Sequence, residues 1–341
     1  KIYFQHMSYH KTSILKSSIQ DTIFLAPKAT SLNEVVISAS KFKQSKKEVP
    51  QNIISISSKE IQFYNPQTSA DLLSNSGRVF VQKSQLGGGS PMIRGFSTNR
   101  LLITVDGVRL NNAIFRSGNV QNVLSINPFN VQRTEVILGA GSVIYGSDAI
   151  GGVMNFYTTT PKLSESKTVN FTSRSTIRYA SANNEKTSHV DFNLGFQKWG
   201  FHSSVSVSDF GDLKMGTRGP DDYLSLHYTE HLNGQDLMVQ NSTPRVQKFT
   251  NFRQLHLAQK VLYKVNNDLK FDLGFHYSTT SDYPRYDRLA SYDSEGVLSY
   301  AEWNYGPQDW LLANLQMTKL SSRSNLHDKV KVSVAYQNFK E

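Results

Sequence analysis

The sequence predicts a small α+β domain followed by antiparallel strands of a transmembrane β-barrel, and two observations lead to this fold class. Residues 41–160 mix helix and strand signals, whereas residues 168–339 alternate apolar and polar side chains in one segment after another. Side chains of a strand point alternately to its two faces, so each later segment has one apolar and one polar face. Connections of alternating length between the segments favour a membrane barrel over a soluble sandwich.

We expect seven strands in the second part of the chain. They lie at about residues 168–180, 188–198, 200–209, 251–264, 268–278, 308–320 and 328–339. The expected short links are Trp199-Gly200, Asn266-Asn267 and 321–327, and the expected longer ones are 181–187, 210–250 and 279–307. Plugged outer-membrane transporters use about 22 strands. We therefore expect a fragment of such a barrel, with further strands beyond Glu341.

Helix and turn signals define the first domain. Ser57 or Ser58 can cap a short helix whose first turn contains Glu60, and a second helix begins near Thr68. The run LLITVD at 101–106 predicts a buried strand that ends in the turn dipeptide Asp106-Gly107. A further strand at 131–138 ends at Gly139.

Composition excludes several classes of function. The chain has no cysteine, which rules out disulfides, thiolate metal sites and cysteine nucleophiles. Its net charge of +10 suggests nucleic acid first, but the basic residues are scattered. We therefore favour solvated loops or a surface facing anionic lipid, and expect no nucleic-acid partner. The sequence contains no Gly-x-Ser-x-Gly elbow, His-Glu-x-x-His site or P-loop, so we expect neither an enzyme nor a resident metal or cofactor.

Three stretches carry a resemblance to a known family. They are SLNEVVISAS at 31–40, MIRGFSTNRLLITVDGVRLNN at 92–112 and NPFNVQRTEVILGAGSVIYGSDAIGGVMNFYT at 127–158. Together they resemble the plug domain of TonB-dependent outer-membrane receptors, and the third is similar to the form in cobalamin- and heme-type receptors. The matching plug motif residues are Gly95, Asp106, Gly107, Gly139, Gly141, Tyr145, Gly146, Gly151 and Gly152.

The resemblance implies a domain order. Residues 1–30 resemble the end of a carboxypeptidase-regulatory-like β-domain, and residues 31–40 the TonB box region. Residues 41–160 would form the plug, and residues 165–341 the first strands of an incomplete barrel. The expected location is the outer membrane of a Gram-negative bacterium.

The resemblance also implies a partner for the TonB box. The residues Asn33, Glu34, Val35, Val36 and Ile37 would bind TonB by strand addition, which uses main-chain hydrogen bonds to an exposed sheet edge. The alternative is an ordinary strand that closes the preceding small domain.

Two further groups of residues are assigned roles in the plug. Arg94, Arg133 and Glu135 resemble plug charges that pair with the barrel wall, since buried charges need partners. The alternative is a set of surface ion pairs. The apical loops at 85–91 and 113–119 would face the substrate or pack against the barrel. Their candidate residues are Gly87, Gly88, Gly89, Phe115 and Arg116.

The function that these features predict is TonB-dependent active uptake of a scarce nutrient, such as an iron–siderophore, heme or cobalamin. The expected partners are TonB, outer-membrane lipid and the small-molecule substrate. His227 and His231 are heme-ligand candidates in the second long connection, and the alternative is a polar loop with incidental histidines. An outer-membrane adhesin or a passive pore without TonB coupling is the alternative function.

Overall fold

The computed structural model describes residues 2–4, 12–18, 23–25, 35–42, 44–83, 86–110, 123–321 and 327–341. These residues form two compact units, 1–50 and 51–341. In the first unit, β1 (Ile2–Phe4) pairs with β2 (Thr12–Ile14), and β3 (Val35–Val36) pairs with β4 (Gln44–Ser45). Both pairings are antiparallel. Asn33 and Glu34 of the predicted TonB box lie outside the described residues.

A five-stranded mixed sheet forms the centre of the plug, in the order β5-β10-β11-β8-β9. Its strands are β5 (Ile53–Ser57), β8 (Leu101–Val105), β9 (Val108–Arg109), β10 (Val131–Ile137) and β11 (Gly152–Thr158). All five residues of β8 are buried, as the apolar run LLITV predicts. The β8–β9 hairpin turns at Asp106 and Gly107, which have φ of 50° and 87°. Asp-Gly is a preferred pair for such a turn, because both positions need positive φ.

Three short α-helices accompany the sheet: α1 (Ser58–Tyr64), α2 (Ser69–Ser74) and α3 (Ser142–Tyr145). The first two begin with complete capping boxes, made by Ser57 with Glu60 and by Thr68 with Asp71. Each box satisfies two backbone N–H groups that the helix itself leaves unpaired. The two predicted helix starts are therefore found where the sequence placed them. No helix among the described residues is long and apolar enough to cross a membrane.

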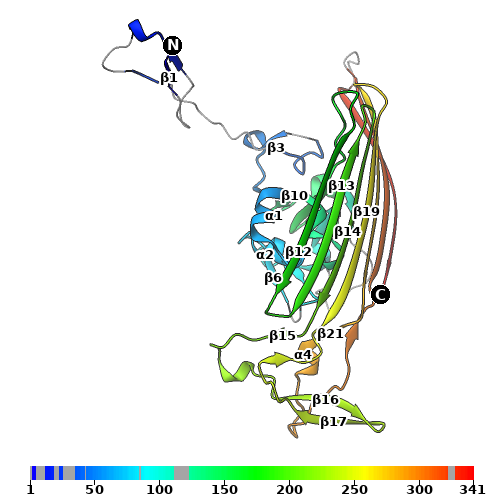
Figure 1. Cartoon of the computed structure of the whole chain (residues 1–341). Helices are drawn as coiled ribbons and strands as arrows, with labels where there is room; N and C mark the ends of the chain where they lie inside the picture. Colours follow the sequence, from blue (N-terminus) through cyan, green and yellow to red (C-terminus); the bar gives the residue numbers. More distant parts are fainter. Residues whose placement is uncertain are drawn as a thin grey trace. The chain divides into compact units, whose positions relative to one another are not determined.

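The second part of the chain forms a seven-stranded antiparallel sheet in which all neighbours are consecutive long strands. The strands are β12 (Asn170–Ala180), β13 (Glu185–Gly195), β14 (Trp199–Phe210), β19 (Phe252–Lys264), β20 (Leu269–Thr280), β23 (Asp309–Leu320) and β24 (Lys329–Lys340). Plug elements lie along one face of this sheet (Figure 1). The fold class is an α+β plug followed by antiparallel strands of the barrel type.

The two faces of the sheet differ in polarity, as the alternation predicts. In β20, Leu273 and Phe275 are exposed, whereas Gly274 between them and His276 and Ser278 beyond them are buried on the plug side. In β14 most buried positions are polar and include His202 and Ser206, whereas Phe210 at the end of the strand joins an apolar cluster. The apolar face is therefore open, as a lipid-facing surface requires, and the polar face meets the plug.

The connections correct two expectations. The link predicted at 181–187 has only the four residues 181–184, because β13 begins at Glu185. The expected Trp199-Gly200 link lies inside β14, and the turn falls at 196–198 instead. Two connections are long, 211–251 and 281–308, and we call them the outer connections. Short secondary-structure elements and one end of the plug lie next to these two connections.

The outer connections contain their own secondary structure. The first holds β15 (Leu213–Lys214), β16 (His227–Leu232), β17 (Gln235–Gln240) and β18 (Val246–Gln247). The second holds β21 (Tyr283–Pro284), α4 (Tyr286–Leu289) and β22 (Asn304–Tyr305). These elements lie beyond one end of the long strands (Figure 1).

The face assignment predicts the effect of placing a charge in β20. In the full-length receptor, Leu273→Arg should destabilise the folded barrel by about 2–4 kcal/mol, because a guanidinium near the bilayer midplane must be desolvated. Asp272→Arg, on the adjacent lumen-facing position, should have a much smaller effect. Unfolding in lipid vesicles measures both, and equal effects would show that the two faces are wrongly assigned.

Candidate functional site: the contact between plug and barrel wall

Arg178 and Glu185 form a buried ion pair at the start of the barrel wall. The Arg178 Nη2 and Glu185 Oε1 atoms are 2.6 Å apart, and the exposed fractions of the two side chains are 7% and 0%. They occupy diagonal positions on neighbouring strands, where long side chains reach each other. An isolated charge at this depth would be very costly, so each side chain requires the other.

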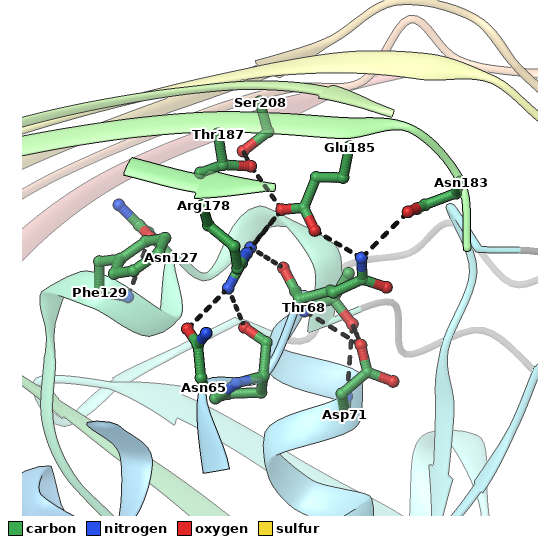
Figure 2. A network of polar contacts seen from close by, with 12 residues as sticks. Asn65, Thr68, Asp71, Asn127, Phe129, Arg178, Asn183, Glu185, Thr187 and Ser208 are labelled. Atoms are coloured by element: carbon green, nitrogen blue, oxygen red, sulfur yellow. Dashed lines mark hydrogen bonds and ion pairs between the residues drawn. The ribbon is translucent and has the colours of Figure 1, made fainter. Parts of the chain in front are cut away.

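The same pair binds the plug between its first two helices (Figure 2). Arg178 Nη1 donates to the carbonyl of Pro66 at 2.8 Å and to Asn65 Oδ1 at 3.3 Å. Gln67 Nε2 in turn donates to Glu185 Oε2 and to Asn183 Oδ1. Asn65 ends α1 with φ of 44°, which turns the following carbonyl groups toward the wall. The wall therefore donates hydrogen bonds to oxygen atoms of Asn65 and Pro66 in the plug and accepts hydrogen bonds from Gln67.

A second anchor centres on Asp106 in the β8–β9 turn. Lys260 Nζ lies 3.0 Å from Asp106 Oδ2 and donates to Thr158 Oγ1 at 2.9 Å. The N–H of Thr158 donates to Asp106 Oδ1 at 2.9 Å, and His276 Nε2 lies 3.6 Å from Oδ2. Burial by itself raises the pKa of Asp106, but the Lys260 ammonium and His276 outweigh it and hold that pKa well below its usual range. Asp106 is therefore an anion that links two plug strands to two wall strands.

A third anchor is the plug segment 127–129. Phe129 stacks on the His189 ring with centroids 4.9 Å apart, and the Arg178 guanidinium lies 5.1 Å from the Phe129 ring centroid. Arg174 Nη2 donates to the Phe129 carbonyl at 2.9 Å. His189 Nε2 lies 2.8 Å from Asp191 Oδ2, which also accepts from Arg174 Nε. The segment is thus held by stacking and by charge-assisted hydrogen bonds.

Arg133 and Glu135, which were expected to reach the barrel wall, form an ion pair with each other. Arg133 Nε lies 3.0 Å from Glu135 Oε1, and the guanidinium also faces the Tyr157 ring at 5.2 Å. Arg94 is exposed and has φ of 49° in the turn after β7 (Ser90–Met92). Asp106, which the sequence analysis assigned only to the turn motif, is a plug charge that pairs with the wall, through Lys260.

The plug motif residues lie where the chain turns or packs closely. A β-carbon added at Gly151 or Gly152 would lie within 3 Å of Phe96 or of the Ile137 carbonyl, so both positions require glycine. Tyr145 accepts a hydrogen bond from Asn155, and burial raises its pKa to about 12. The positive-φ members of the motif are Gly95, Gly107, Gly139 and Gly146, and Gly141 packs against Val153.

One predicted apical segment contacts the second outer connection. A β-carbon added at Gly87 would lie 3.0 Å from the Tyr283 side chain. Tyr283 belongs to a buried cluster with Leu86 and Leu124 of the plug and with Phe210 and Phe252 of the wall. Gly88 and Gly89 follow Gly87 on the way to β7, and Gly89 packs against Ala70. Phe115 and Arg116 lie outside the described residues.

His227 and His231 do not form a common ligand site. Both lie on β16, where a spacing of four residues separates them by about 13 Å along the strand. Two axial ligands must bond the same iron atom, so this pair cannot hold one heme. Each has its own neighbour: His227 Nδ1 lies 3.2 Å from the Tyr292 hydroxyl, and His231 Nδ1 lies 2.8 Å from Asp236 Oδ1. The described residues contain no cluster of three metal-ligating side chains.

Sequence reasoning missed the residues that anchor the plug. Arg178 lies on the predicted polar face of its strand, but nothing local indicates which charge it meets. Glu185 fell in a predicted connection, so alternation gave no signal for it. Lys260 and Asp106 are separated by 154 residues, and only the folded structure brings them together.

The arrangement defines a class: a plug domain held by polar contacts against the lumen face of a barrel wall. Residues 45–153 match the family model described as the TonB-dependent Receptor Plug Domain. This segment is therefore a plug domain of the TonB-dependent receptors, a family of the Gram-negative outer membrane.

Similar proteins agree with this assignment. The vitamin B12 transporter BtuB of Vibrio vulnificus strain CMCP6 is 39% identical over 140 residues, which are 40% of this chain and 22% of that protein. Its counterpart in strain YJ016 is 33% identical over 187 residues, 54% of this chain and 26% of that protein. The chain thus spans about a quarter of the length of these curated relatives. They are transporters rather than enzymes.

Solved structures of low identity share the fold. The copper transporter OprC has a TM-score of 0.58 at 16% identity, over 84% of this chain and 37% of that one. The ferripyoverdine receptor of the Pseudomonas aeruginosa outer membrane has a TM-score of 0.57 at 13% identity, over 89% of this chain and 36% of that one. The shared part is therefore the plug with the first strands of the wall.

The Arg178–Glu185 pair yields a prediction for the full-length receptor. Glu185→Gln should destabilise the docked plug by about 3–5 kcal/mol, because it leaves the Arg178 charge buried without its partner. The matched control is Glu165→Gln, which changes an exposed residue of the same type. Hydrogen exchange at residues 65–68 measures the effect. Equal protection in the two variants would contradict a role of the pair in docking.

The Asp106 anchor predicts a dependence on pH. A carboxylate with a lowered folded-state pKa contributes full stability above its ordinary value of 3.8, and that contribution is lost as the pH falls through the folded-state pKa. Thermal unfolding in detergent should therefore show a loss of stability below about pH 4. Asp106→Asn should be less stable near neutral pH and should lack that part of the acid transition. An unchanged acid slope in the variant would count against this assignment.

Proposed function

We propose that this chain is part of a receptor that takes up a scarce nutrient across the outer membrane by TonB-dependent transport. The observation that carries the proposal is the plug held on the lumen face by buried polar anchors. An adhesin has no need of such a domain, and a passive pore would be obstructed by it.

The chemistry of the anchors suits a plug that must move. A hydrogen bond to a charged group adds only about 1.5–3 kcal/mol in net terms, because water can take its place when it breaks. The anchors at Arg178, Asp106 and Phe129 consist mainly of such bonds and of ion pairs. A polar contact can open in a hydrated lumen at lower cost than an apolar contact of the same area. The plug is therefore specifically positioned and still removable.

The proposed energy source is TonB, acting on residues 33–37. Strand addition needs an extended segment with free main-chain groups. Two residues of this segment are extended: Val35 and Val36 form β3, with Val36 opposite Gln44. Recruitment of TonB would require β3 to exchange β4 for a strand of its partner.

The substrate would bind between the apical plug segment and the outer connections. The contact between Gly87 and Tyr283 supports this location, since it joins the plug to a long connection at the wall end. The similar proteins include a vitamin B12 transporter and a receptor that binds ferripyoverdine. We assign this chain to the same broad class of uptake, with an iron complex or a cobalamin-like molecule as substrate.

A backbone substitution at Val36 tests the TonB step. In the full-length receptor, Val36→Pro should reduce energised uptake to background, because proline removes an N–H group and disfavours strand pairing. Substrate binding should stay within about twofold of wild type. The matched control is Val36→Ile, which keeps the β-branched side chain and the N–H, and should transport normally. Uptake by the proline variant at the wild-type rate would favour passive entry.

A further inference from the structure

The segment that joins the plug to the wall is itself bound to the wall. Residues 159–164, which we call the joining segment, follow β11 and contact the hairpin of β13 and β14. The Lys162 N–H donates to Asn193 Oδ1 at 2.7 Å, and Asn193 Nδ2 donates to the Lys162 carbonyl at 3.1 Å. The Ser164 N–H donates to the Phe196 carbonyl at 3.0 Å. The wall therefore pairs with backbone groups along the joining segment, much as a neighbouring strand would.

Two glycines of the wall let the joining segment approach this closely. A β-carbon added at Gly195 would overlap the Lys162 carbonyl oxygen, and one added at Gly200 would lie 3.1 Å from the Pro161 β-carbon. Glycine within a strand often marks a place where another backbone comes near. Pro161 and Ser164 are buried in this contact. The sequence of the hairpin is therefore fitted to the joining segment.

We propose that the joining segment is a fixed pivot, which stays bound to the wall while the rest of the plug opens. The inference rests on the proposed function, because it describes how the plug of a TonB-driven receptor would move. It adds that one end of the plug is held and that the displacement grows toward the other end.

The joining segment and the outer connections lie at opposite ends of the wall. Consecutive antiparallel strands reverse direction at each connection, so the turn at 196–198 and the connection at 211–251 lie at opposite ends of β14. The contact between Gly87 and Tyr283 belongs to the end of the outer connections. A plug that turns about the joining segment therefore separates most at the Gly87–Tyr283 contact.

A short covalent link keeps the joining segment at the wall. Residues 165–169 alone separate Ser164 from Asn170, the first residue of β12. The Ser164 hydroxyl donates to the Thr168 carbonyl at 2.6 Å, which holds this short loop in place. Closing a short loop costs little entropy, and partners tethered in this way meet at an effective concentration of about millimolar. A contact that opens here therefore re-forms quickly.

The other anchors lack such a link. The contact of Arg178 with the Pro66 carbonyl and that of Lys260 with Asp106 join residues more than a hundred positions apart in the chain. Once these contacts open, only the rest of the fold brings the partners together again. The joining segment is thus the part of the plug that is best able to stay on the wall.

The pivot also holds the middle of the plug sheet. β11, which leads into the joining segment, is the third of the five strands and pairs with both β10 and β8. A strand with two neighbours transmits its position to both of them through ladder hydrogen bonds. Fixing the end of β11 therefore fixes the point about which the whole sheet turns.

Two engineered disulfides in the full-length receptor test the pivot. The 341 residues contain no cysteine that would compete for the introduced thiols. Pro161→Cys with Gly200→Cys, the inner disulfide, locks the joining segment, and Gly87→Cys with Tyr283→Cys, the outer disulfide, locks the opposite end. The β-carbons are 3.1 Å and 3.0 Å apart. Disulfides place them about 3.5–4.5 Å apart, so both pairs need a small shift of similar size.

Hydrogen exchange at residues 65–68 and 125–130 in detergent measures how often the plug leaves the wall. Each variant is compared in its oxidised and its reduced form, and mass spectrometry verifies the disulfide. The outer disulfide should slow exchange about tenfold or more, because it ties down the end that moves. The inner disulfide should change exchange by less than about twofold, because the segment that it locks stays in place. Equal effects of the two disulfides, whether both slow exchange or neither does, would overturn the proposal.

A substitution at Asn193 provides a second test. Asn193→Leu removes the side chain that binds Lys162, so exchange at residues 162–164 should rise about tenfold. The matched control is Asn267→Leu, at an exposed asparagine in the turn at 265–268, which should leave that exchange unchanged. Circular dichroism verifies that both variants are folded. Equal exchange at residues 162–164 in the two variants would likewise overturn the proposal.

The pivot and the proposed function are tested separately. The exchange measurements use neither substrate nor TonB, so their failure would leave TonB-dependent uptake intact. Uptake by the Val36→Pro variant at the wild-type rate would count against the proposed function and would leave the pivot untouched.

Discussion

The requirement that every buried charge on the lumen face has a partner governs how the plug and the wall fit together. Arg178 with Glu185, and Lys260 with Asp106, are almost fully shielded from solvent. Burying either charge of a pair without its partner would cost much free energy. The plug and the wall must therefore pack together in a single register. A slip of one residue in β12 or β19 would turn these side chains toward the apolar face. The ion pairs therefore fix the position of the plug more than they strengthen it.

The same constraint explains why the two faces of one sheet behave so differently. The outward positions carry Leu, Val and Phe, which need no partner in an apolar medium. The inward positions carry hydroxyl, amide, imidazole and charged groups, whose hydrogen bonds the plug completes. Among the described residues, Trp310 and Leu312 of the wall join the apolar core of the plug, and Phe339 packs against it. Phe210 and Phe252 of the wall form a second, smaller cluster with Leu86 and Leu124 of the plug. The contact between the plug and the wall is thus specific, and the free energy that stabilises it is limited.

Local patterns made most of the fold predictable. Alternation is a property of neighbouring residues, so it located the seven strands to within a few residues, and the capping boxes at Ser57 and Thr68 marked two helices. Contacts between distant residues could not be predicted in this way. Which plug groups meet Arg178, and that Lys260 meets Asp106, depends on packing between segments more than a hundred residues apart.

Tyr283 connects the second outer connection with the plug. It packs against Gly87 and faces Tyr305, with ring centroids 6.0 Å apart. Tyr305 accepts a hydrogen bond from Arg285, whose guanidinium also lies over the Trp303 ring. A ligand can shift the plug only if it binds one arrangement of these groups better than another. Because Gly87 has no side chain, a small displacement of Tyr283 would be transmitted directly to the plug backbone, which makes this contact the natural point of coupling.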